Sequence, residues 1–167
     1  MLSLIDRIED VAENMNKPVT FIAGDDENTI SWAELHTDAK IVAAGLQARG
    51  VKPGDHVALL GPTTQKFVTA VQAAWICGAV LVTMPLPMRM GALDLFISQT
   101  RARIRGADSK VVVIDSELAA FVEPIDCDPP FIPLDELFGE GAASIDDYKR
   151  PKSDPNLPRS SSLTPRR

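Results

Sequence analysis

Along the chain, stretches in which apolar residues have the spacing of a helix alternate with short runs that are apolar throughout, as in buried strands. Four stretches carry an apolar residue every three or four positions, which predicts amphipathic helices. These stripes are Leu4, Ile8, Val11 and Met15; Leu35, Ala39, Val42 and Leu46; Phe67, Val71, Ala74 and Trp75; and Leu93, Ile97, Thr100 and Ile104. Residues 56–60, 79–84 and 110–115 are instead apolar enough to be strands buried on both faces.

The order from residue 56 to residue 115 is therefore strand, helix, strand, helix, strand. Short buried strands that alternate with amphipathic helices predict an α/β fold, with a parallel sheet covered by helices on both faces. Each crossover between neighbouring strands is expected to be right-handed.

Local signals place several boundaries. Ser31 and Glu34 fit a capping box at the start of the second helix, because the serine hydroxyl and the glutamate can each bond the other's backbone amide. Upstream, a strand at 19–24, an acidic turn at 25–28 and a returning strand at Thr29 predict a hairpin.

The signal weakens after residue 116. A short helix at 116–121, a proline-broken segment and one helical turn near 134–138 are expected there. Order is expected to fade from about residue 140. We therefore predict a domain at 1–139, followed by a linker and a disordered tail at 140–167.

Composition narrows the function classes. The 167 residues suffice for one domain, and 17 basic against 23 acidic residues give a net charge of −6, which argues against a broad basic face for nucleic acid. The basic residues of the tail are interpreted as a solvated end. They are Lys149, Arg150, Lys152, Arg159, Arg166 and Arg167.

No membrane span is predicted, because the longest apolar run, AAWICGAVLV, is roughly half the length that one needs. The N-terminal stretch carries acids every few residues and does not fit a signal peptide. A cytoplasmic location is expected.

The candidate chemical groups each have a structural explanation. Cys77 and Cys127 form no disulfide or metal pattern, and Cys77 is predicted to be a small core residue. His36 and His56 are expected on the surface or in loops. Residues 61–66 (GPTTQK) follow a buried strand and open a helix, where a phosphate could meet free amides. They lack the ending and the second glycine of a phosphate loop, which favours a plain turn.

Two charged clusters are equally ambiguous. Asp25, Asp26 and Glu27 are interpreted as a solvated turn. Arg101, Arg103 and Arg105 lie near the end of the fourth helix, where positive charge is favourable, with a phosphate or partner site as the alternative. The sequence contains no GxGxxG, HExxH, GxSxG or CxxC motif. The residues by themselves predict an α/β fold and no active site.

Four stretches nevertheless resemble motifs of the adenylate-forming (AMP-binding) enzyme superfamily in their order and spacing. They are ISWAEL, GVKPGDHVALLGP, AAWICGAVLVTMPLP and QTRARIRGADSKVVVID, within a similarity that spans residues 5–135. The stretch PLPMRMGALDLFISQTRARI is most similar to fatty acyl-AMP ligases and long-chain fatty acyl-CoA synthetases. The resemblance implies that residues 1–139 form an incomplete N-terminal subdomain of this ligase fold.

The resemblance also implies a reaction. Such ligases join a fatty acid to the α-phosphate of ATP, release pyrophosphate and transfer the acyl group to coenzyme A or a carrier protein. Their phosphates are held by Mg²⁺ and a glycine-rich loop, and later motifs and a lid lysine complete the site. Here the chain departs from the family at Asp154–Leu157 into PRSSSLTPRR, with no glycine after Gly141. Ser160, Ser161, Ser162 and Thr164 match the loop in composition only.

No catalytic, cofactor-binding or metal-binding residue can therefore be carried over, and this chain is expected to bind no cofactor. The first hypothesis is a truncated ligase fragment that is inactive alone, with a frameshift near Leu157. The alternative is a non-catalytic α/β module that pairs with a full-length ligase. A small flavodoxin-like enzyme has little support. Exposed apolar faces predict self-association.

Overall fold

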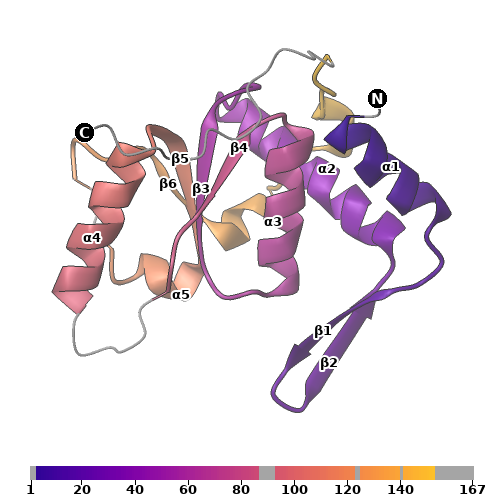
Figure 1. Cartoon of the computed structure of the whole chain (residues 1–167), viewed down its shortest axis with the longest axis horizontal. Helices are drawn as coiled ribbons and strands as arrows, with labels where there is room; N and C mark the ends of the chain where they lie inside the picture. Colours follow the sequence, from indigo (N-terminus) through magenta and orange to yellow (C-terminus); the bar gives the residue numbers. More distant parts are fainter. Residues whose placement is uncertain (1–2, 87–92, 123–124, 140, 153–167) are drawn as a thin grey trace.

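The computed structural model describes residues 3–86, 93–122, 125–139 and 141–152. In this part of the chain, a four-stranded parallel sheet lies between two helical layers, and a two-stranded hairpin projects from one side (Figure 1). The strand order is β4-β3-β5-β6. The strands are β3 (His56–Leu60), β4 (Val80–Thr83), β5 (Ser109–Ile114) and β6 (Phe131–Pro133). The predicted α/β fold with a parallel sheet is confirmed.

The sheet follows the apolar runs closely. The strand predicted at 56–60 is exact, and those predicted at 79–84 and 110–115 are observed within a residue of those limits. β6 is an additional strand, which pairs with β5 through Val112–Phe131 and its neighbours. Its three residues lie in the proline-broken segment, where no alternation of apolar and polar residues identifies a strand.

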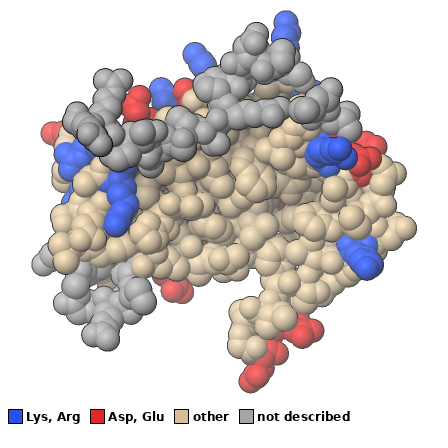
Figure 2. All heavy atoms as spheres, in the orientation of Figure 1, with Lys and Arg blue, Asp and Glu red and all other residues tan. Residues whose placement is uncertain are grey.

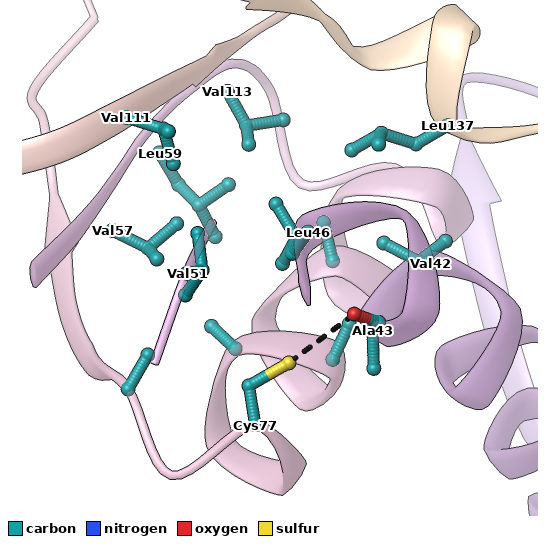
Figure 3. Packing of buried hydrophobic residues seen from close by; sticks show 14 of the residues in the cluster. Val42, Ala43, Leu46, Val51, Val57, Leu59, Cys77, Val111, Val113 and Leu137 are labelled. Atoms are coloured by element: carbon teal, nitrogen blue, oxygen red, sulfur yellow. Dashed lines mark hydrogen bonds between the residues drawn. The ribbon is translucent and has the colours of Figure 1, made fainter. Parts of the chain in front are cut away.

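Alternate residues of each central strand face opposite helical layers. Val57, Leu59, Val111 and Val113 belong to a first core cluster, together with residues of α2 and α3 (Figure 3). The residues between them, such as Ala58, belong to a second cluster that includes residues of α4 and is contacted by α5. These helices are α2 (Trp32–Ala48), α3 (Gln65–Ile76), α4 (Leu93–Gly106) and α5 (Ser116–Ala119). Burial on both faces explains why these strands are apolar throughout.

α1 (Leu4–Asn14) lies outside this sandwich, against α2 and α3 (Figure 1). No residue of α1 is fully buried, and Ile8 is half-buried against the first core cluster. Leu4 and Met15, at the two ends of the predicted stripe, are exposed. The helix is therefore correctly predicted, but its apolar stripe is only partly covered.

The inner face of α3 differs from the prediction at Trp75, whose side chain is 38% exposed. The residues that α3 buries completely are small ones, including Ala70, Ala73 and Ala74. Small side chains let α3 pack closely against α2 and the sheet. The predicted stripe followed the large apolar residues and therefore included one that faces outward.

The hairpin consists of β1 (Val19–Ala23) and β2 (Asp26–Ile30), paired antiparallel. The turn is shorter than predicted: Gly24 and Asp25 make it, while Asp26 and Glu27 are the first residues of β2. Gly24 has a φ of +64°, which glycine adopts without steric cost. The acidic residues are exposed at the end of this arm (Figure 2).

Residues 141–152 include the short 3₁₀ helix η3 (Ile145–Asp147), and a further 3₁₀ helix, η2 (Leu134–Leu137), follows β6. Order was expected to fade from about residue 140, yet residues 147–151 contact α2 and border Gly78. The stretch carries no periodic apolar pattern, so these contacts left no signal in the sequence. The tail at 153–167 and most of the connector at 85–91 lie outside the described residues. The domain boundary at residue 139 stays a prediction.

Candidate functional site

Ligands of open α/β sheets enter at the carboxyl ends of the strands, where the strand order reverses. In this chain, β3 lies between β4 and β5, so its two neighbours are reached by crossovers in opposite directions. The loop that begins at Gly61 and the loop that begins at Asp115 follow β3 and β5 at this edge. This edge is therefore the first candidate for a functional site.

Close packing rather than an opening joins these two loops. A Cβ atom placed on Gly61 would lie 3.1 Å from the Cβ of Asp115 and 3.2 Å from Cδ2 of Phe67. The amide of Asp115 also donates to the carbonyl of Leu60 at 2.8 Å. Gly61 is thus needed because two loops and a helix meet there.

Lys66, the basic residue of the candidate phosphate turn, pairs with another side chain of the protein. Its ammonium group forms an ion pair with Asp135 of η2 and lies 5.7 Å from the ring centroid of Phe138. The hydrogen bond from Lys66 holds the pKa of the Asp135 carboxyl below its usual range, and a hydrogen bond with Ser116 lowers this pKa to a smaller extent. Thr64 caps α3 by accepting from the amide of Phe67 at 3.2 Å. This arrangement is that of a strand-to-helix turn.

The polar groups after β5 are engaged in the same way. Asp115 caps α5 through bonds from the amides of Glu117 and Leu118, and the hydroxyl of Ser116 accepts from the amide of Asp135 at 3.4 Å. Among residues 3–86, 93–122, 125–139 and 141–152, no group of three or more His, Cys, Asp or Glu residues is arranged to hold a metal ion. The polar side chains described at this edge therefore bond groups of the protein itself.

The predicted positions of the two histidines were wrong. His36 lies in α2 and is 7% exposed, and its Nδ1 is 3.1 Å from Nε2 of Gln72 on α3. Burial and nearby Lys40 lower the pKa of His36 below its ordinary value. His56 is the first residue of β3, half-buried, with Nδ1 2.5 Å from the carbonyl of Ala107. Both histidines join neighbouring elements of the fold.

The two cysteines differ in environment. Cys77 is buried, as predicted, and its Sγ lies 3.5 Å from the carbonyl oxygen of Ala43 (Figure 3). Burial raises the pKa of the Cys77 thiol to about 12, which keeps it unreactive. Cys127 is exposed.

The arginines of α4 are only partly at the helix end. Arg103 and Arg105 are in the last turn, as the helix-dipole interpretation requires. Arg101 instead pairs with Asp128, with Nε and Oδ2 2.9 Å apart, and the Asp128 side chain is 1% exposed. This pair anchors the segment after α5 to α4, a role that no sequence signal indicated.

An open cleft of about 490 Å³ lies between the end of α2 and the segment that follows η2. Its lining includes Gln47, Lys52, Pro53, Asp147, Lys149 and Arg150. Sequence analysis missed this cleft because one of its walls is the stretch that we predicted to be a linker. None of the site candidates from the sequence lies in it.

The comparison with protein families shows to which family the chain belongs. The AMP-binding enzyme family matches residues 8–154, which is most of the chain. The chain belongs to the AMP-binding enzyme family. The resemblance found in the sequence is thereby confirmed, and the match extends beyond residue 135, where the similarity inferred from the sequence ended.

Curated relatives are much longer than this chain. It is 32% identical over 92 residues to a putative acyl-CoA synthetase of Caulobacter vibrioides, which covers 55% of the chain and 16% of that protein. It is 27% identical over 118 residues to ScoC of Streptomyces coeruleorubidus, a fatty acid–[acyl-carrier-protein] ligase, over 70% of the chain and 21% of that ligase. The chain thus spans about a fifth or less of the length of these two relatives.

Solved structures confirm the fold of this AMP-binding family member. The fatty acyl-adenylate ligase of L. pneumophila, in complex with acyl adenylate and pyrophosphate, superimposes with a TM-score of 0.75 at 23% identity. The superposition covers 93% of this chain and 26% of that ligase. The fold is therefore the N-terminal part of the adenylate-forming ligase fold.

None of the helices in the described part of the chain has the length and apolar character that a membrane crossing requires.

Proposed function

We propose that this chain is the N-terminal part of a ligase that activates a fatty acid with ATP. The acyl-adenylate would then pass to coenzyme A or to a carrier protein. The family match, the fatty acid ligase ScoC and the structural relative that holds an acyl adenylate and pyrophosphate support this substrate class. Such a reaction needs hydrogen-bond donors and Mg²⁺ around the moving phosphoryl group.

The chain alone is proposed to be inactive. The observation that carries this is the internal pairing at the carboxyl edge of the sheet: Lys66 bonds Asp135, and Asp115 bonds the amides of α5. These groups are used to hold the scaffold together, and they leave the chemistry to other parts of such a ligase. We accordingly assign no catalytic, cofactor-binding or metal-binding residue to this chain. ATP, Mg²⁺, fatty acid and acyl acceptor would bind the complete ligase, in the cytoplasm.

A pyrophosphate-release assay tests this proposal. The purified 167-residue chain, given ATP, Mg²⁺ and a fatty acid, is expected to release no pyrophosphate above the background without protein. Formation of acyl-adenylate by this chain would overturn the proposed inactivity.

A chimaera tests the scaffold role separately. Residues 8–152 replace the matching segment of a full-length fatty acid ligase, and the folded chimaera is expected to keep measurable acyl-adenylate formation. A folded but completely inactive chimaera would count against the proposal. Stoichiometric binding of the unmodified chain to an intact ligase would instead support the alternative of a non-catalytic partner module.

A further inference from the structure

The segment 145–151, which we call the strap, contacts three helices that are distant from it in sequence. Tyr148 donates its hydroxyl hydrogen to the carbonyl oxygen of Ile76 at the end of α3, at 3.0 Å. The side-chain amide of Gln47 on α2 bonds both backbone groups of Lys149, at 2.7 and 2.9 Å. The strap is therefore fixed to the ends of α2 and α3.

Arg150 extends from this fixed strap to α1. Its guanidinium bonds Glu9 through two parallel contacts, Nε to Oε1 at 2.9 Å and Nη2 to Oε2 at 3.0 Å. It also bonds Oδ1 of Asp6. Bidentate pairs of this kind combine charge with a fixed geometry, which makes them specific even where the side chains are partly exposed. Oδ2 of Asp6 accepts from the amide of Ser3 at 2.7 Å, so the carboxylate that binds Arg150 also caps α1.

Besides this ion pair, α1 is held by apolar residues that are only half-buried: Ile5, Ile8, Val11 and Ala12. None of its residues is fully buried, Leu4 is 56% exposed, and Ile8 packs only partly against the first core cluster. α1 therefore buries less apolar surface than α2 and α3, and the stabilisation that such burial gives is smaller for α1. The contacts with Arg150 thus add to apolar packing that is weaker than that of α2 and α3, which bury several residues completely.

We propose that the strap is a latch, in which the Arg150 guanidinium holds α1 on the helical layer so that α1 detaches as a unit when this contact is lost. This conformational device goes beyond the proposed function and does not depend on it. Elements held by few buried contacts open locally at low free energy, without global unfolding. The latch predicts such local opening for α1, while the sheet stays closed.

Hydrogen exchange measured by mass spectrometry on the whole chain tests the latch. Arg150→Ala is expected to speed exchange of the α1 amides by roughly fivefold, because it removes a multiply bonded ion pair. Exchange in β3 and β5 is expected to stay unchanged. The matched control is Lys149→Ala, which alters the neighbouring basic side chain and keeps the backbone bonds to Gln47.

Two further variants keep the test independent of the folding of Arg150→Ala. Glu9→Gln removes one charge from the α1 side with almost no change in shape, and it is expected to speed exchange in α1 by a smaller factor. Arg150→Lys keeps the charge but loses the planar fork, and it is expected to fall between the wild type and Arg150→Ala. Unchanged α1 exchange in Arg150→Ala and Glu9→Gln, or equally faster exchange in every element, would overturn the latch.

Discussion

His36 is a buried imidazole at the contact of α2 with α3, and its pKa makes the fold sensitive to acid. Burial lowers the pKa most, Lys40 lowers it further, and Glu9 and Glu13 of α1 oppose this. The unfolded chain therefore takes up a proton first as the pH falls below the ordinary value of 6.5. We expect the full contribution of neutral His36 above that pH and a progressive loss as the pH falls towards the folded-state pKa.

Chemical denaturation at pH 7 and at pH 5.5 measures this effect. In His36→Gln, the free energy of unfolding should fall less between the two pH values than in the wild type, because residue 36 no longer titrates. His56→Gln removes the other histidine and is the matched control. An identical fall in the wild type and His36→Gln would show that His36 does not cause the acid sensitivity.

The two cysteines give a simple test of packing. Cys77 is buried with a pKa raised to about 12, whereas Cys127 is exposed. We expect a thiol reagent at pH 8 to modify Cys127 in the folded protein and to modify both only after denaturation. Cys127→Ser should then show no fast reaction. Fast modification of Cys77 in that variant would mean that α2 and α3 separate easily.

At the scale of elements, the junction between β3 and α3 depends on the absence of a side chain at Gly61. Because a Cβ there would press on Asp115 and Phe67, Gly61→Ala should destabilise the fold by about 1–2 kcal/mol. Gly106→Ala, at the end of α4, meets no atom within 4 Å and should be neutral or stabilising by up to about 1 kcal/mol. Denaturant unfolding measures both, and equal stabilities would contradict the close approach.

The elements themselves show what sequence periodicity determines. The helices and the strands β3, β4 and β5 were predictable because packing imposes a period of 3.6 on helices and a run of apolar residues on strands covered by helices on both faces. The capping box of Ser31 and Glu34 was predictable because it depends on local spacing alone, and the structure contains both of its bonds. β6 and η3 were not, because contacts with distant residues rather than local periodicity define them.

At the candidate site, too, features set by the local sequence were predictable and features set by distant contacts were not. Buried Cys77 followed from its apolar neighbours, and the plain-turn interpretation of 61–66 agrees with the pairing of Lys66. The partners Asp135, Asp128 and Arg150 lie far along the chain from the groups they bind, so no short motif announces them. The burial of His36 was missed because a helix surface becomes buried only when another helix packs on it.

At the scale of the whole molecule, several large apolar side chains in the described part of the chain are left uncovered. Leu95 of α4 is 58% exposed, Phe121 after α5 is 47% exposed, and Ile125 is 46% exposed. β4 ends the sheet on one side, and its apolar residues Val80–Val82 are only half-buried. Such surfaces are suited to packing against other segments or other chains, and we expect them to promote association between copies of this chain.

We therefore expect the purified chain to self-associate as its concentration rises, which light scattering coupled to gel filtration measures. Replacing Leu95 and Phe121 by Glu should shift the protein towards monomer, because charged side chains resist the burial that association requires. Ser98→Glu on the same helix changes an already polar, exposed position and is the matched control. A wild-type chain that stays monomeric at every concentration and melts in one sharp transition would show that these apolar surfaces need no partner.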